Sequence, residues 1–170
     1  MIELRITPQQ IERAKINRKN LPENSNNSIR AGDGTIIGCL GEVVLADYLG
    51  VPLCNTYDYD LIYKDQKVEI KTKDRTVPPA PFYNCTVSAA NATQKCDFYF
   101  FMSLLKDMSK GWLVGYLSRN EFFDKAFYLA EGERDYGKEL PAACYNVQIA
   151  NTRSPVDIRK NQQICSPVFR

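Results

Sequence analysis

The stretch YDYDLIYKDQKVEIKTK, residues 57–73, decides how the rest of the chain is interpreted. Its polar segment 64–67 separates two short apolar runs, which predicts a β-hairpin. Residues 68–72 alternate apolar and charged side chains, and this period of two places Glu69 and Lys71 on one strand face, about 6–7 Å apart. Asp60 directly precedes the first apolar run, so a hairpin in register brings its carboxylate to the same place.

Two carboxylates and an ammonium group at one end of a hairpin are costly unless a ligand uses them. Carboxylate oxygens bind a divalent cation, and an ammonium group binds a phosphate or a hydroxide. The alternative is an ordinary exposed hairpin face, on which Asp60, Glu69, Lys71 and Lys73 form cross-strand ion pairs. The buried helix and apolar strands predicted on either side of the hairpin favour the functional site.

Length and composition narrow the class of protein. At 170 residues, 44% hydrophobic and 25% charged, the chain is typical of one globular domain. Its net charge of +2 does not indicate nucleic-acid binding by bulk charge, so any basic surface must be local. The absence of His excludes a Ser-His triad, a Cys-His pair and His-ligated zinc. Six Cys without a CxxC pair argue against structural zinc.

No targeting or membrane segment is expected. The N-terminus is charged from Glu3 onward and lacks the apolar core of a signal peptide. No run approaches the roughly 18 apolar residues of a membrane span. The sequence therefore predicts a cytoplasmic protein with reduced thiols, with one disulfide pair as the minority alternative.

Two helices are predicted before the hairpin. Residues 7–20 carry an N-cap threonine, Thr7, with proline next to it and Gln10 at capping-box spacing. Residues 35–49 are apolar at helical spacing, so this second helix should be largely buried. Within it, Gly38 and Gly41 allow close approach of another backbone, and Glu42 is expected to be buried or half-buried near the hairpin. The alternative places Glu42 on an exposed stripe with Asp47.

The remaining elements complete a small α/β fold. We expect a proline-rich loop at 74–84, a short helix at 88–95 capped by Ser88, and a short strand near 145–149. Two apolar runs, 98–105 and 111–117, predict buried strands, and Ser118 with Glu121 begins a helix over 118–129. The predicted fold is a single domain with a central mixed β-sheet flanked by helices.

The order of these elements and side chains resembles the PD-(D/E)XK nuclease superfamily. A buried helix carries Gly41-Glu42, Asp60 opens a strand, and Glu69-Ile70-Lys71 lies on the next strand. The resemblance covers about residues 36–129, and it implies a restriction-endonuclease-like core with an N-terminal helix and loop, 1–35, and a C-terminal extension, 130–170. The chain departs from the motif where Tyr59, rather than proline, precedes Asp60.

The resemblance implies roles for these residues. Asp60 and Glu69, together with the carbonyl of Ile70, would hold Mg²⁺, for which Mn²⁺ would substitute. Glu42 would bind this ion through water or bind a second ion. Lys71 would orient the metal-activated water that attacks the phosphodiester and would offset negative charge in the transition state. Asp58 competes with Asp60 for the aspartate role, and Asp60 is preferred because the apolar strand follows it directly.

Further side chains are candidates for contact with nucleic acid. Lys73 shares the face of Lys71, and Arg75 follows in the proline-rich loop. Arg30 belongs to a locally basic N-terminal part, for which a solvated helix face is an equally good interpretation. Gln94 lies on the predicted short helix, where an ordinary surface glutamine is the favoured interpretation. Lysine and arginine contacts of this kind supply affinity without reading sequence.

The resemblance thus implies a metal-dependent nuclease that hydrolyses phosphodiester bonds in DNA, similar to small phage or mobile-element enzymes. A homodimer is possible and no nucleotide cofactor is expected; a phage-encoded enzyme would act in the host cytoplasm. One alternative is a catalytically silent nucleic-acid-binding protein on the same fold, against which the complete acid set argues. Another is a protein-interaction module, such as an inhibitor of a host defence enzyme, which would expose apolar side chains from segment 122–128.

Overall fold

A mixed five-stranded sheet forms the centre of the computed structural model, which describes residues 1–20, 35–54, 56–156 and 158. Its strand order is β1–β6–β5–β3–β2, in which β3 and β5 run parallel and the other neighbours run antiparallel. The strand bounds are Ile2–Arg5 (β1), Leu61–Tyr63 (β2), Gln66–Arg75 (β3), Phe98–Leu105 (β5) and Lys110–Ser118 (β6). The predicted α/β class with a mixed sheet is confirmed.

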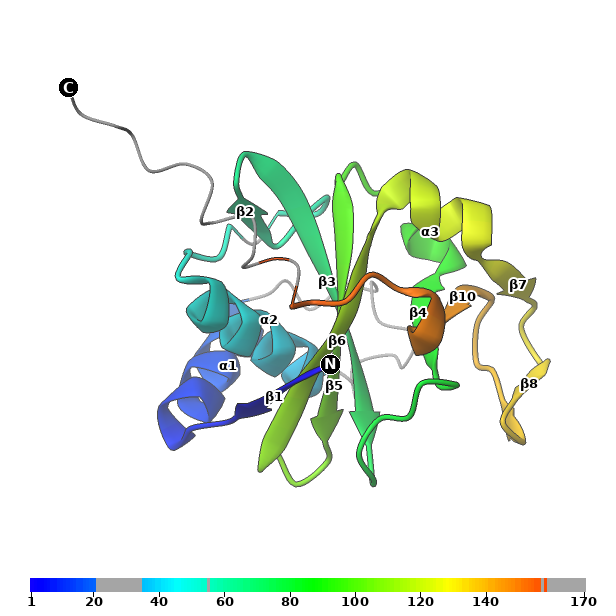
Figure 1. Cartoon of the computed structure of the whole chain (residues 1–170). Coiled ribbons are helices and arrows are strands. Elements are labelled where there is room, and N and C mark those ends of the chain that lie inside the picture. The colour runs from blue at the N-terminus through cyan, green and yellow to red at the C-terminus, as the bar shows by residue number, and fades with distance from the viewer. Residues whose placement is uncertain (21–34, 55, 157, 159–170) are drawn as a thin grey trace.

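Helices α1 (Pro8–Asn20) and α2 (Thr35–Leu49) pack on one face of this sheet (Figure 1). A second, antiparallel sheet in the order β4–β10–β7 lies on the other side of the molecule with α3 (Figure 1). These elements and the remaining short ones span Asn84–Ser88 (β4), Ala89–Asn91 (η1), Arg119–Lys125 (α3), Phe127–Leu129 (β7), Arg134–Asp135 (β8), Lys138–Glu139 (β9), Cys144–Gln148 (β10) and Ile149–Asn151 (η2).

Strand β5 supplies side chains to two hydrophobic cores because alternate residues point to opposite faces of a sheet. Phe100, Met102 and Leu104 join the core beneath α1 and α2. Tyr99 and Phe101 join the core between the main sheet, α3 and the second sheet. This double burial explains the continuous apolar run of 98–105, which the sequence predicts as a buried strand.

Local signals place the helix starts where the sequence predicts them. At α1, Thr7 and Gln10 form the expected capping box, with the Gln10 amide donating to Thr7 Oγ1 and Gln10 Oε1 accepting from the Thr7 amide. At α3, Ser118 and Glu121 form the second capping box. Helix α2 spans the predicted range of 35–49. Within the described part of the chain, no helix has the length and apolar character needed to cross a membrane.

Helix α2 approaches β3 closely at Gly41. A Cβ atom at this position would overlap the side chain of Thr72 on β3, so only glycine fits here. At Gly38 a Cβ atom would meet nothing within 4 Å, so the expectation of close packing holds for Gly41 alone. The contact at Gly41 brings the next residue, Glu42, to the hairpin.

Three local predictions are wrong. Helix α3 ends at Lys125 rather than near residue 129, because Ala126 is extended and 127–129 pair with β10 as β7. The predicted helix at 88–95 is one 3₁₀ turn, and the Ser88 side chain does not cap it. Strand β3 continues to Arg75, so the predicted loop begins two residues later than expected.

Candidate functional site

The hairpin of β2 and β3 forms as predicted and positions Asp60. Lys64 and Asp65 have positive φ angles of 51° and 61°, which suit a tight two-residue turn. The resulting register pairs Leu61 with Val68. The Asp60 amide donates to Val68 O at 2.9 Å, and Asp60 Oδ2 accepts from the Ile70 amide at 2.7 Å. This second bond fixes the carboxylate against β3.

Glu69 and Lys71 form a buried ion pair on β3. Their atoms Oε1 and Nζ lie 2.6 Å apart, and the side chains are 8% and 16% exposed. The interpretation of this stretch as an ordinary exposed hairpin face is therefore wrong for these two residues. A buried carboxylate and ammonium stay charged only with close partners, which each supplies to the other.

Gln94 completes this arrangement, although the sequence favoured a surface glutamine. The residue is only 2% exposed. Its Nε2 donates to Glu69 Oε1 at 2.9 Å and to Tyr57 O at 2.8 Å, and its Oε1 accepts from Lys71 Nζ at 3.1 Å. Gln94 therefore binds both members of the ion pair and links them to the segment before β2.

Glu42 reaches the same cluster from α2. It is half-buried, whereas Asp47 on the same helix is exposed and pairs with Arg13 at 2.7 Å. The exposed-stripe alternative for Glu42 is thus wrong. Burial, with a further contribution from the nearby charge of Glu69, raises the pKa of Glu42 to about 7 against the opposing effect of Lys71.

Asp60 has the same electrostatic character. Burial raises its pKa, and the charges of Glu42 and Glu69 raise it further, while the Ile70 amide and Lys71 act in the opposite direction. Three carboxylates and one ammonium group thus share one desolvated region where α2, β2 and β3 meet. Clusters of this kind, in which like charges disfavour each other, are common at functional sites.

The competing aspartate, Asp58, lies outside this cluster. Its Oδ1 accepts a hydrogen bond from the Lys95 amide at 3.0 Å and so fixes the segment that carries Gln94. Of the two aspartates that the sequence leaves open, Asp60 is the one near Glu42 and Glu69.

Two of the four candidates for nucleic-acid contact lie on β3. Lys73 and Arg75 follow Lys71 on the same strand face and line a narrow space beside β4. Arg75 is on β3 itself and not in the following loop, and its Nε donates to Ser103 Oγ at 3.0 Å. Arg30 lies outside the described residues.

An open depression of about 560 Å³ adjoins Gln94. Its walls include Gln94, Lys95, Asp97, Phe98 and Arg119. Arg119 is held by the carbonyl oxygens of Ala92 and Gln94, at 2.6 and 3.1 Å. The depression is therefore lined largely by polar side chains, and it meets the cluster at Gln94, whereas Glu69 and Lys71 do not line it.

The donor chemistry of the cluster suits a hard divalent cation, which prefers carboxylate oxygens. Glu69 Oε2 is buried and has no hydrogen-bond partner, as expected of an oxygen that a cation could satisfy. As the side chains stand, however, no three His, Cys, Asp or Glu residues of the described chain are grouped closely enough to hold a metal ion. The cluster thus fits a divalent cation in the type of its donor atoms and in its charge, but not in the spacing of its side chains.

Comparison with protein-family models finds no match to this chain, and comparison with curated proteins finds no relative.

Proposed function

We propose that the protein is a metal-dependent nuclease of the PD-(D/E)XK type that hydrolyses phosphodiester bonds in DNA. One observation carries the proposal: the Glu69–Lys71 pair is buried on β3 at the point where Glu42 and Asp60 approach it. A restriction-endonuclease-like core is part of this proposal, supported by the mixed sheet and by the place of α2 against β3. The acid set is complete, which argues against a catalytically silent form.

Asp60, Glu69 and Glu42 would hold Mg²⁺ or Mn²⁺, with the Ile70 carbonyl as a further oxygen donor. A bound divalent ion supplies Lewis-acid activation of the phosphodiester and of the attacking water. Hydrolysis forms a bond from the water oxygen to phosphorus and breaks one phosphorus–oxygen ester bond, and the leaving oxygen takes up a proton.

Lys71 has the second role in the reaction. Its ammonium group lies in a desolvated region, where a positive charge stabilises negative charge that develops on the phosphate far better than in water. Gln94 and Glu69 hold this ammonium group in one orientation through bonds of 3.1 and 2.6 Å. The Lys71 ammonium group is therefore already in place, and the site does not have to reorganise when negative charge develops on the phosphate.

A cleavage assay tests the proposal on supercoiled, linear, single-stranded and branched DNA with Mg²⁺ or Mn²⁺. We expect cleavage that a chelator abolishes. Lys71→Ala and Asp60→Asn should each lower the rate by about 10²-fold or more, since each removes one charged group from the reacting centre. The preferred substrate would identify the kind of DNA that the enzyme cuts.

Asp58→Asn is the matched control for Asp60→Asn. It removes the same charge two residues away and keeps an oxygen that accepts from the Lys95 amide. We expect this variant to cleave at close to the wild-type rate. A folded wild-type protein that cleaves no substrate and binds no divalent ion in calorimetry would overturn the nuclease proposal.

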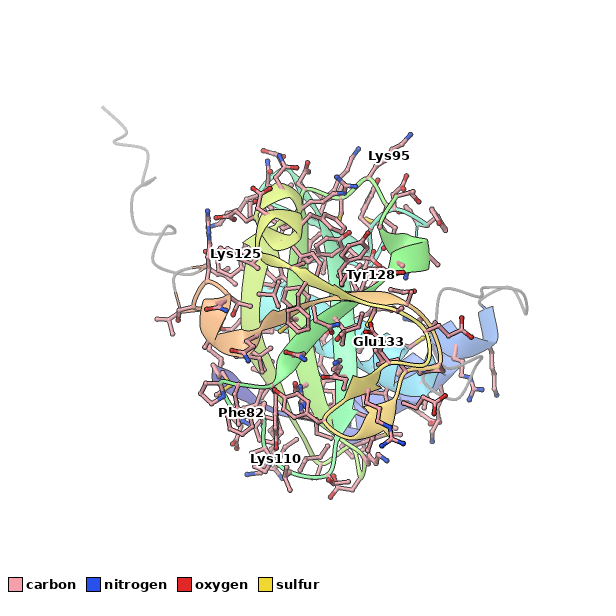
Figure 2. The ribbon with its side chains drawn as sticks, turned by 90° about the vertical axis from the view of Figure 1, so that its right-hand side faces the viewer. Phe82, Lys95, Lys110, Lys125, Tyr128 and Glu133 are labelled. Atoms are coloured by element: carbon pink, nitrogen blue, oxygen red, sulfur yellow. The ribbon has the colours of Figure 1, made fainter. Side chains whose placement is uncertain are left out.

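A protein-interaction module is the second candidate function. Phe127 and Tyr128 on β7 are exposed, whereas Phe122 in the same aromatic segment is fully buried. Tyr128 lies on the side of the second sheet that faces the viewer in Figure 2, where it is labelled. This candidate becomes the better one if the folded protein cleaves no DNA substrate.

The homodimer and the cytoplasmic location remain predictions from the sequence.

A further inference from the structure

Strand β3 presents three cations in a row toward the second sheet, and their partners differ. Lys71 is held by Glu69 and Gln94. Arg75, at the other end, donates to Ser103 Oγ, and its guanidinium lies 4.4 Å from the centre of the Tyr83 ring. Both ends of the row are therefore fixed by neighbours of the main body.

Lys73, in the middle of the row, is less well satisfied. Its side chain is 34% exposed, and among the described residues its charged partner is Asp135, with Nζ and Oδ2 4.0 Å apart. This distance is at the limit of an ion pair. Burial lowers the pKa of Lys73, the charge of Arg75 lowers it further, and Asp135 opposes both. A half-buried ammonium group with one distant carboxylate has unused capacity to bind an anion.

Asp135 belongs to a small hairpin of β8 and β9, which Figure 2 shows toward the viewer near Glu133. These two strands pair only with each other in the described sheets. Among the described residues, two adjacent side chains of the hairpin bond to the body, and the Tyr136 ring also packs against the rings of Phe82 and Tyr83. Asp135 Oδ1 accepts from Asn84 Nδ2 at 2.9 Å, and the Tyr136 hydroxyl donates to Phe82 O. The β8–β9 hairpin can therefore separate from the body without breaking a hydrogen bond within the five-stranded or the three-stranded sheet.

The space beneath the hairpin is small. The cavity between the cation row and β4 measures about 10 Å³, which is room for about one water molecule. A larger anion does not fit into this cavity, and the position beside the Lys73 ammonium that Asp135 holds is the one from which it could bind. A carboxylate and a phosphate both offer negative oxygens to an ammonium group, so one can replace the other.

We propose that Lys73 binds a backbone phosphate of the DNA strand and that the Asp135 carboxylate occupies this phosphate position until DNA displaces it. The proposal rests on the nuclease function proposed above. It extends the contact with DNA from the acid cluster along β3, and it makes the β8–β9 hairpin a competitor of the substrate.

Binding of a fluorescein-labelled DNA duplex, measured by anisotropy in a chelator at several salt concentrations, tests this inference. Lys73→Gln should weaken binding by about tenfold and lower the salt slope by about one phosphate contact. Asp135→Asn should tighten binding by several-fold, because it removes the competing charge but keeps an oxygen for the Asn84 amide. The double variant should bind like Lys73→Gln alone, since the carboxylate acts through Lys73.

Glu139→Gln is the matched control, because it removes the same charge from the same hairpin at an exposed position. If Asp135→Asn binds no more tightly than Glu139→Gln, while the wild type binds and cleaves DNA, this inference is wrong and the nuclease function stands. If the wild type neither binds nor cleaves any DNA, both proposals fail together.

Hydrogen exchange supplies a second measurement that does not depend on a variant. DNA should accelerate exchange of the amides in 133–140, because the hairpin leaves its contacts with Asn84 and Phe82. Unchanged or slower exchange in this segment when DNA is bound would overturn the displacement.

Discussion

At the scale of single residues, Gln94 is the side chain on which the Glu69–Lys71 pair depends most directly. It is buried and bonds both residues, so a near-isosteric Gln94→Met change would remove one hydrogen-bond partner from Lys71 Nζ and one from Glu69 Oε1. We expect cleavage to fall by about 10–100-fold with the fold intact, a loss typical of residues that orient a catalytic group. The pH profile of cleavage should change as well, which a purely structural role would not cause. Gln66→Met, at an exposed glutamine at the start of β3, should have neither effect.

Glu42 makes the stability of the metal-free protein depend on pH. Its pKa is about 7 in the folded chain and 4.5 in its usual state. Between these values the folded chain holds a proton that the unfolded chain has lost, so the free energy of unfolding falls as pH rises through this range. We expect a decrease of about 1–3 kcal/mol between about pH 5 and about pH 7.5.

Urea denaturation in a chelator measures this dependence. Glu42→Gln should flatten it, and the raised pKa of Asp60 should leave a remainder of the same sign. Excess Mg²⁺ should remove most of the decrease, because a cation bound to the carboxylates favours their charged forms. Stability that rises with pH over this range, or that Glu42→Gln leaves unaltered, would contradict the assigned environment of Glu42.

The sequence identifies the acidic and lysine side chains of the site, but it does not identify the residues from distant parts of the chain that contact them. The period of two places Glu69 and Lys71 together because it is a local property of a strand. The contacts of Gln94 join residues 23, 25 and 37 positions apart, and no spacing pattern indicates them. The same holds for the pairing of Lys73 with Asp135, which depends on where the β8–β9 hairpin folds back.

At the scale of elements, the approach of α2 to β3 controls the position of Glu42. In Gly41→Ala the new methyl group would overlap Thr72, whose branched side chain has little freedom to move. We expect a loss of about 1–3 kcal/mol in the free energy of unfolding and slower cleavage, because α2 must shift away from β3.

Gly38→Ala is the control in the same helix, three residues earlier. Its methyl group meets nothing within 4 Å, so the change should be neutral or stabilise by up to about 1 kcal/mol. Urea denaturation of both variants decides the comparison. Equal effects of the two substitutions would mean that helix propensity, rather than contact with Thr72, explains the glycine at 41. Thr72→Ala should restore part of the stability lost in Gly41→Ala.

Long elements with strong periodicity or capping residues were predictable, and short ones paired across the chain were not. Helices α1 and α2 and strands β5 and β6 lie where the sequence places them. Strand β7 continues directly from α3, and its pairing with β10 ends the helix early. Strand β1 was not predicted, although the sequence carries a signal for it. Its apolar and charged residues alternate, and its burial alternates with them.

At the scale of the whole molecule, the second sheet is the feature that the sequence could not reveal. Its three strands come from 84–88, 127–129 and 144–148, and each has five residues or fewer. The sequence predicts one of them, as a short strand near 145–149, whereas the runs at 84–88 and 127–129 have too little periodicity to be distinguished from a loop or a helix end. The sheet nevertheless completes the core on one side of β5, so residues 144–149 belong to the packed body.

Because β5 belongs to both cores, the two halves of the molecule should unfold together. Helices α1 and α2 cover one core and dominate the helical far-UV signal, whereas Trp112, the single tryptophan, lies in the other. Separate stability of either half would require β5 to keep its structure with one face exposed to water, which its apolar alternate residues disfavour. We therefore expect far-UV circular dichroism and tryptophan fluorescence to give the same urea midpoint.

Leu40→Ala tests this coupling from the helical side. Leu40 is fully buried on α2, so the cavity should cost about 2–5 kcal/mol. Both signals should shift equally, although Trp112 lies on the opposite side of the sheet. Ile16→Ala, at an exposed position of α1, should move neither midpoint by more than about 0.5 kcal/mol. If Leu40→Ala shifted the helical signal alone, α1 and α2 would form a separately stable layer, and the position of Glu42 would then vary independently of Glu69 and Lys71 on β3.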